Sequence, residues 1–132
     1  MFELEIVPRV SETDGAGHIN NSVIPIWFEA GRRPIFEFLT PDLRFQDWKA
    51  SLVNMNVDYV RQTFFQDTAV VKTWIEKIGN KSFQVYEEIT QNNQLCAKGT
   101  ATYVYFDFKA QKSEVIPAHV RTQLEKHLRE SM

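Results

Sequence analysis

The residues best suited to chemistry gather in one short stretch, residues 13–22, which reads TDGAGHINNS. The stretch combines a carboxylate, an imidazole and two amides, and an apolar run follows it directly. Asn21 and Ser22 are natural N-cap residues, and Pro25 suits the first turn of a helix that starts there. The free N–H groups and the positive dipole end of that helix should lie beside the carboxylate and the imidazole. This arrangement suits polarising a carbonyl oxygen.

Each of these residues also has a purely structural interpretation. Asp14 precedes a glycine, a common turn pair, although the complete stretch favours a chemical role for it. His18 is better interpreted as a hydrogen-bonding residue that orders the loop than as a catalyst. Asn20 and Asn21 fit capping and substrate contact equally well. The spacing of Asp14, His18 and Glu29 matches no zinc motif, so we expect no metal site.

Composition narrows the class of protein. The chain of 132 residues is 43% hydrophobic, which predicts one globular domain over residues 1–132 with a single core. A formal net charge of -2 offers no basic surface to nucleic acid. The chain start lacks a secretory signal, and no run approaches the roughly 18 apolar residues of a membrane helix, so we expect a cytoplasmic protein without a membrane partner. Cys96, the single cysteine, excludes an intrachain disulfide and is expected to be buried.

The elements that must position the stretch begin with a helix. Residues 22–39 are apolar nearly all round, which predicts a buried helix. Pro34 removes a helix hydrogen bond and its ring clashes with the preceding turn, which predicts a kink or break between residues 30 and 34. Glu29 can pair along the helix with either of two arginines, Arg32 and Arg33.

The rest of the chain reads mainly as strands. Alternation with a period of two predicts a short strand at residues 2–7 and four longer ones at about residues 51–59, 69–78, 82–90 and 94–108. Gly99, inside the last strand, is where that strand could bulge or curve around something. Pro117 opens a final amphipathic helix with Val120, Leu124 and Leu128 on one face, and His119 and His127 are interpreted as surface residues. This order predicts an α+β fold in which a curved antiparallel sheet wraps around one buried helix, plus a C-terminal helix.

At this point the residues carry a resemblance. TDGAGHINN followed by IWFEAGR resembles the signature of the hotdog-fold acyl thioesterases, specifically the 4-hydroxybenzoyl-CoA thioesterase-like group. The matching positions are Asp14, Gly17, His18, Asn20, Asn21, Trp27, Glu29 and Arg32. Residues 57–59 and 78–83 are similar too, so the likeness spans nearly the whole chain. This sequence departs from the pattern at Ile24, where relatives usually carry an aromatic residue, and at Pro34.

The resemblance implies a hotdog fold and hydrolysis of the thioester of an acyl-CoA or acyl carrier protein. Asp14 would be the base or nucleophile, because an aspartate is normally ionised at neutral pH. Asn21 and His18 would complete the catalytic group, and N–H groups at the helix start would hold the carbonyl oxygen. Coenzyme A would enter as part of the substrate, with no separate cofactor. The expected substrate-binding residues are Gly17, Asn20, Ser22, Glu29, Tyr59, Arg61, Lys81 and Ser82, with Lys72 and Lys77 as further phosphate partners.

Two other function classes remain open at the level of sequence. Hotdog dehydratases and hydratases use a histidine with an acid on the helix, and His18 with Glu29 could imitate that pair. A non-catalytic acyl-binding module would keep the groove without turnover. For any of the three, a sheet with an unpaired edge predicts a homodimer or a tetramer of two such dimers.

Overall fold

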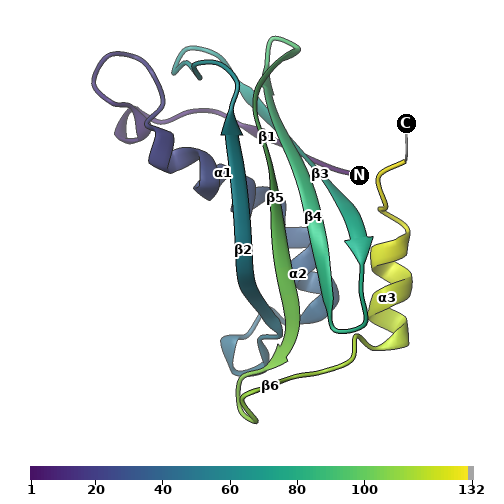
Figure 1. Cartoon of the computed structure of the whole chain (residues 1–132). Helices are drawn as coiled ribbons and strands as arrows, with labels where there is room; N and C mark the ends of the chain where they lie inside the picture. Colours follow the sequence, from purple (N-terminus) through teal and green to yellow (C-terminus); the bar gives the residue numbers. More distant parts are fainter. Residues whose placement is uncertain (131–132) are drawn as a thin grey trace.

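The computed structural model describes residues 1–130, and its centre is one curved antiparallel sheet (Figure 1). Its strand order is β1-β3-β4-β5-β2, and a short β6 pairs with the end of β5. The strands are β1 (Phe2–Ile6), β2 (Ala50–Tyr59), β3 (Ala69–Ile78), β4 (Ser82–Gln91), β5 (Gln94–Asp107) and β6 (Lys112–Ser113). The five longer strands were predicted from period-two alternation, and β6 was not.

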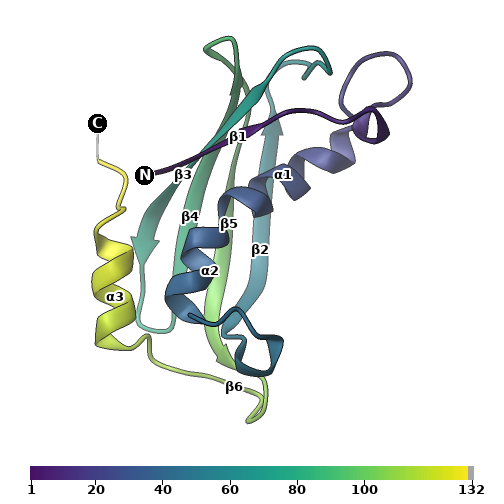
Figure 2. The ribbon, with the colours of Figure 1, turned by 180° about the vertical axis from the view of Figure 1, so that it is seen from behind.

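Helices cover one face of this sheet. α1 (Ile24–Gly31) and α2 (Arg33–Leu39) lie one after the other across the concave face, and α3 (Ala118–Glu125) packs beside β3 and α2 (Figure 2). Short 3-10 turns occur at Val10–Glu12, Asn21–Val23 and Phe45–Asp47. The predicted arrangement of a curved sheet around a central helix is therefore confirmed.

The core lies between the helices and alternate side chains of the strands. Trp74 and Tyr86 point to the other face of the sheet, where their ring centroids are 5.8 Å apart. Cys96 is buried, as expected from the sequence. The side chains of β3 and β4 that face the helices without any exposed area are Ala69, Val71, Thr73, Ile75, Val85 and Ile89.

The predicted break in the central helix is confirmed, and it lies at Arg32. This residue is both the C-cap of α1 and the N-cap of α2. Pro34 falls in the first turn of α2, where its missing N–H is no loss. The helix is less completely buried than its composition suggested, because Ile26 is 58% exposed. Two short helices thus replace the single helix expected over residues 22–39.

No bulge occurs at Gly99, so the first of the two alternatives for this residue is wrong. Gly99 pairs in regular register with Val57 on β2 and with Glu87 on β4. A Cβ at this position would clash with the carbonyl oxygen of Asn56. Close approach of the neighbouring backbone, and not a change of register, therefore requires the glycine.

The C-terminal segment corrects two further expectations. α3 ends before Leu128, and the chain at residues 127–129 runs parallel to β3 instead. The Ile75 N–H donates to the His127 carbonyl at 2.9 Å, and the Arg129 N–H donates to the Ile75 carbonyl at 2.8 Å. His127 is not an ordinary surface residue, because its ring stacks on Phe2 with centroids 4.1 Å apart. Its pKa is lowered by partial burial and by the nearby N-terminal amine.

One edge of the sheet is covered by other parts of the chain, and the edge formed by β2 is not. β1 and the C-terminal segment together cover the outer side of β3. β2 pairs only with β5, so within the described chain its outer side carries no partner strand. The register of β2 shifts between Leu52 and Asn54, which marks a bulge near its start. Large exposed apolar side chains lie along this edge, at Leu52, Val53, Met55 and Tyr59.

Candidate active site

The loop that carries Asp14 and His18 is a closed turn. The Asp14 N–H donates to the His18 carbonyl at 2.9 Å, and Asp14 Oδ1 accepts the N–H of Ala16 at 2.9 Å. Gly15 and Gly17 have φ of 90° and 86°, a region that residues with a Cβ rarely adopt. The glycines therefore allow the tight turn that presents the carboxylate beside the imidazole.

Asp14 and His18 lie together on the rim of this loop. Asp14 Oδ2 is 3.8 Å from His18 Nδ1, and the two side chains are 40% and 37% exposed. The His18 ring meets the ring of Phe64 edge-on, with centroids 5.2 Å apart. This packing supports the ordering role expected for His18. The second carboxylate oxygen of Asp14, Oδ2, makes no short hydrogen bond in the described chain.

The loop is joined to the segment between β2 and β3. The Ile19 N–H donates to the Thr63 carbonyl at 2.7 Å, and the Phe65 N–H donates to the Gly17 carbonyl at 2.9 Å. Ile19 itself is only 5% exposed and packs into the core beside α1. These contacts position Gly17 structurally, and its expected contact with substrate remains a prediction.

Glu12 is a structural residue of the site that the sequence analysis missed. It is 6% exposed, and its carboxylate accepts the backbone N–H of Arg9 at 2.8 Å and the indole N–H of Trp27 at 2.9 Å. Burial opposes its ionisation, but hydrogen bonds from the Arg9 side chain and Trp27 outweigh burial and hold the pKa of Glu12 below its ordinary value. Its carbonyl also accepts the Asn20 N–H at 2.9 Å. The buried Trp27, whose N–H needs an acceptor, was the available signal.

The start of the central helix leaves one backbone donor unused. Asn20, and not Asn21 or Ser22, is the cap, because its Oδ1 accepts the N–H and the hydroxyl of Ser22, both at 2.9 Å. The helix proper begins later than expected, at Ile24, with Pro25 in its first turn. No hydrogen bond among the described residues uses the Asn21 N–H. Of the N–H groups expected to hold a carbonyl oxygen, this one remains open.

A cavity of about 440 Å³ lies beside this donor. The Tyr59 hydroxyl donates to the Asn21 carbonyl at 2.7 Å, which ties the end of β2 to the start of the helix. We call this space the helix-start cavity. Its lining residues are Ile19, Asn21, Ile24, Tyr59, Val60, Arg61, Gln62 and Thr63.

The structure separates the cations proposed for phosphate binding. Arg61 alone among them lines the helix-start cavity, and its guanidinium is held by the Leu95 carbonyl and the Gln94 side chain, both at 3.1 Å. Lys72 and Lys77 lie on β3, away from this cavity. The chain does not bring Lys81 and Ser82 to it either, because both lie at the turn between β3 and β4, at the other end of the sheet (Figure 1).

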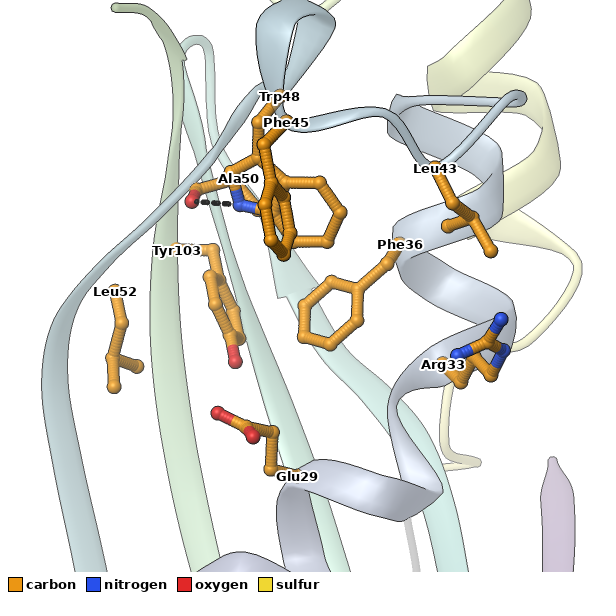
Figure 3. A pocket seen from close by; sticks show the side chains of 9 residues that line it. All are labelled: Glu29, Arg33, Phe36, Leu43, Phe45, Trp48, Ala50, Leu52 and Tyr103. Carbon is orange, nitrogen blue, oxygen red and sulfur yellow. Dashed lines mark hydrogen bonds between the residues drawn. The ribbon is translucent and has the colours of Figure 1, made fainter.

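Glu29 lies in a second cavity, also of about 440 Å³, between the helices and the start of β2 (Figure 3). We call it the aromatic cavity. The Trp48 indole N–H, which borders it, donates to the Ala50 carbonyl at 3.0 Å. Figure 3 shows the Glu29 carboxylate directed towards the Tyr103 hydroxyl across this space. The complete lining is Glu29, Arg33, Phe36, Leu43, Phe45, Trp48, Ala50, Leu52 and Tyr103.

The ion pair expected between Glu29 and Arg32 is wrong. Arg32 is 2% exposed, and its Nε donates to Glu87 Oε1 at 2.7 Å, on β4. Its Nη1 donates to the Tyr103 hydroxyl at 2.9 Å, and Glu87 Oε2 accepts the Thr73 hydroxyl at 2.7 Å. Desolvation, only partly offset by Arg32 and Thr73, raises the pKa of Glu87 to about 7. A buried charged pair thus joins the break in the helix to the sheet.

Arg33, the other expected partner of Glu29, pairs instead with Glu37, at a distance of 3.8 Å between Arg33 Nε and Glu37 Oε1.

Among residues 1–130, no group of three or more His, Cys, Asp or Glu side chains could hold a metal ion. No helix in the same range is long and apolar enough to cross a membrane.

Known proteins agree with this fold. A family model of the thioesterase-like superfamily matches residues 8–124. The protein YneP of Bacillus subtilis (strain 168), named as a candidate acyl-CoA thioesterase, is 30% identical over 107 residues, which are 78% of each chain. A predicted thioesterase from Bacillus stearothermophilus has the same structure with a TM-score of 0.96 at 49% identity, covering 99% of this chain and 98% of that one.

A thioesterase from Thermus thermophilus, solved with coenzyme A and Zn, aligns with a TM-score of 0.86 over 99% of this chain and 96% of that one. At 22% identity this likeness shows the fold alone. Both structures show the hotdog fold that the sequence predicted. The family model, the Bacillus subtilis relative and the Bacillus stearothermophilus structure define the class, a thioester hydrolase. The chain belongs to the thioesterase-like superfamily.

Proposed function

We propose that this protein hydrolyses the thioester of an acyl-CoA, with Asp14 as base or nucleophile. The observation that carries this proposal is the unused Asn21 N–H at the start of the central helix, next to the loop of Asp14 and beside an open cavity. A backbone donor at a helix start is preorganised for the negative charge that develops on a carbonyl oxygen during acyl transfer. Asn20 orders the backbone around this donor, because its Oδ1 accepts both the N–H and the hydroxyl of Ser22.

The reaction can proceed in either of two ways. As a base, Asp14 takes a proton from water, the hydroxide adds to the thioester carbon, and the C–S bond breaks to release the coenzyme A thiol and the free acid. As a nucleophile, Asp14 adds to the thioester carbon, the C–S bond breaks, and the coenzyme A thiolate leaves and takes a proton from solvent. Water then hydrolyses the acyl anhydride on Asp14, which releases the free acid and restores the carboxylate. In both, His18 orders the loop, and coenzyme A is part of the substrate and not a separate cofactor.

The helix-start cavity suits the coenzyme A arm. Tyr59 and Arg61 border it, and Arg61 is the cation best placed for a phosphate. The proposal includes a cytoplasmic location, which a single buried thiol at Cys96 suits because such compartments keep thiols reduced. A free acid and a thiol are the expected products with coenzyme A or acyl carrier protein as the carrier.

The function is tested with purified protein and a panel of thioesters: acetyl-, octanoyl-, palmitoyl- and benzoyl-CoA, and octanoyl acyl carrier protein. We expect release of free thiol well above the uncatalysed rate for at least one acyl-CoA. An enoyl-CoA is included, because hydration of its double bond without thiol release would indicate the hydratase. Tight binding of every thioester without release would indicate a binding module. Either result would contradict the proposal.

We propose further that two copies pair through β2. This edge carries no partner strand in the described chain and exposes large apolar side chains, whereas the opposite edge is covered. Both cavities border β2, so residues of the second copy would line them. A tetramer of two such dimers fits the same edge.

Val53→Lys tests the pairing, because an exposed edge lysine opposes strand addition. We expect the parent to sediment at twice the 15.4 kDa protomer mass or a multiple of that, and the variant to dissociate at micromolar concentration. Val115→Lys is the control. Val115 is as exposed as Val53, at 55% against 58%, but it lies between β6 and α3, away from β2. A fully active monomer of the parent at the same concentration would contradict the pairing.

A further inference from the structure

The aromatic cavity contains polar groups that the proposed mechanism does not use, among them the Tyr103 hydroxyl and the Glu29 carboxylate. Most of its lining is apolar, and the Trp48 ring packs against Phe36 and Phe45, with centroid distances of 5.2 Å and 5.4 Å. Tyr103 rises from β5 into the same space, with its hydroxyl above the Glu29 carboxylate in Figure 3. Its ring is almost fully buried, at 4% exposure.

The other donors around this cavity are already committed. The Trp48 N–H is taken by the Ala50 carbonyl, and the Arg33 side chain is exposed and lies near Glu37. The Tyr103 oxygen accepts a hydrogen bond from Arg32 at 2.9 Å. In the part of the chain that the structure describes, no hydrogen bond uses the hydrogen of this hydroxyl. Tyr103 therefore has a donor to offer to a group inside the cavity.

Buried charges hold this donor in place. Arg32 is fixed by Glu87, which is fixed in turn by Thr73, and both members of the charged pair are 2% exposed. A guanidinium has no acceptor, so a tyrosine bonded to it must accept and can direct its own hydrogen elsewhere. Burial raises the pKa of Tyr103 although Arg32 opposes the change, so the hydroxyl stays protonated at neutral pH. Figure 3 shows the Glu29 carboxylate directed towards this hydroxyl, but no hydrogen bond joins the two in the described chain, so the hydroxyl can donate to an acceptor that a ligand supplies.

We propose that Tyr103 is a specificity-determining residue: its hydroxyl donates to an oxygen atom near the distal end of an acyl group that fills the aromatic cavity. Arg32 is its positioning residue. The inference rests on the proposed function, because it needs the thioester at Asn21. From Asn21 to Glu29 the chain advances about 12 Å along the helix, at roughly 1.5 Å per residue. A medium-length acyl chain spans that distance, and both cavities border the same strand, β2.

The test compares octanoyl-CoA with 3-oxo-octanoyl-CoA and 7-oxo-octanoyl-CoA. In the parent we expect kcat/KM to be highest for the 7-oxo substrate, with the 3-oxo substrate gaining nothing from Tyr103. Tyr103→Phe removes only the hydroxyl, and should lower the preference for 7-oxo-octanoyl over octanoyl about 3- to 10-fold, mainly through KM, as expected for one hydrogen bond. Tyr105→Phe is the matched control, because Tyr105 lies on the same strand outside the cavity. It should leave the preference within twofold.

Arg32→Lys tests the positioning role. It keeps the charge but loses the planar fork that reaches Glu87 and Tyr103 together, so the 7-oxo preference should fall as in Tyr103→Phe while octanoyl turnover persists. If this variant does not fold, Tyr103→Phe decides the proposal alone. A parent without 7-oxo preference, or a preference that Tyr103→Phe leaves unchanged, overturns it.

Failure of the proposed function would be recognised separately. A parent that releases thiol from none of the three thioesters contradicts the thioesterase proposal. Calorimetric binding of the corresponding non-hydrolysable thioethers then tests Tyr103 by itself. Tighter binding of the 7-oxo thioether in the parent, lost in Tyr103→Phe, would support the inference, and equal binding of the two thioethers would overturn it.

Discussion

Replacing Asp14 by asparagine should lower thioester hydrolysis by roughly 10²- to 10⁴-fold, the usual contribution of a positioned general base, or by more if Asp14 is the nucleophile. The melting temperature should stay close to that of the parent. An asparagine oxygen can still accept the Ala16 N–H at the tip of the loop, and asparagine suits this kind of turn. Initial rates with the best acyl-CoA of the panel and a thermal melt measure both quantities.

His18→Ala is the companion variant, and it should give the opposite signature. The His18 ring packs against Phe64 and lies beside Asp14, so its loss should lower loop order, stability and activity together. Binding of a non-hydrolysable acyl-CoA analogue should persist in Asp14→Asn and weaken in His18→Ala. If Asp14→Asn retains activity within threefold while His18→Ala is folded and inactive, the catalytic role belongs to His18.

Arg32→Met should destabilise the protein by about 3–5 kcal/mol at pH 8, because it leaves the Glu87 carboxylate buried without its counter-charge. Urea unfolding monitored by fluorescence gives this free energy of unfolding. Arg33→Met is the matched control. Arg33 is exposed, and its replacement removes only an exposed ion pair with Glu37, in which the charged atoms are 3.8 Å apart. Its cost should be at most about 1 kcal/mol.

The cost of Arg32→Met should also depend on pH in a defined direction. The pKa of Glu87 is about 7 in the folded protein, above its ordinary value of 4.5, so the folded state binds more protons between these values. The stability associated with protonated Glu87 is therefore complete below pH 4.5 and is lost as the pH rises through 7. Without Arg32 that pKa rises further, so the variant should lose more stability with rising pH than the parent does.

The double variant Arg32→Met/Glu87→Gln provides the control for this mechanism. Because it has no titrating group at position 87, it should regain much of the lost stability at pH 8 and little at pH 5. A cost of Arg32→Met that is constant from pH 5 to pH 8 would contradict the titration of Glu87 and would point to packing alone.

Local order was predictable because its causes are local. The alternation that defines β3 and β4 follows from the period of a strand, and the break at Arg32 follows from the ring of Pro34. The loop around Asp14 was predictable for the same reason, since its glycines and Asn20 act on their nearest neighbours. The family signature lies within the same short stretch, and this is why the class of protein could be inferred from the sequence.

Partners distant in the sequence were decided only by the tertiary structure. Arg32 has an acid three residues before it, yet it pairs with Glu87, because the concave face of the sheet brings β4 under the break in the helix. Glu12 meets Trp27 for a similar reason. Period and propensity say which face of an element is buried, but not which residue of another element will lie opposite. The aromatic cavity, the donor at Tyr103 and the open Asn21 N–H all arise from such long-range contacts, so they became visible only in the folded chain.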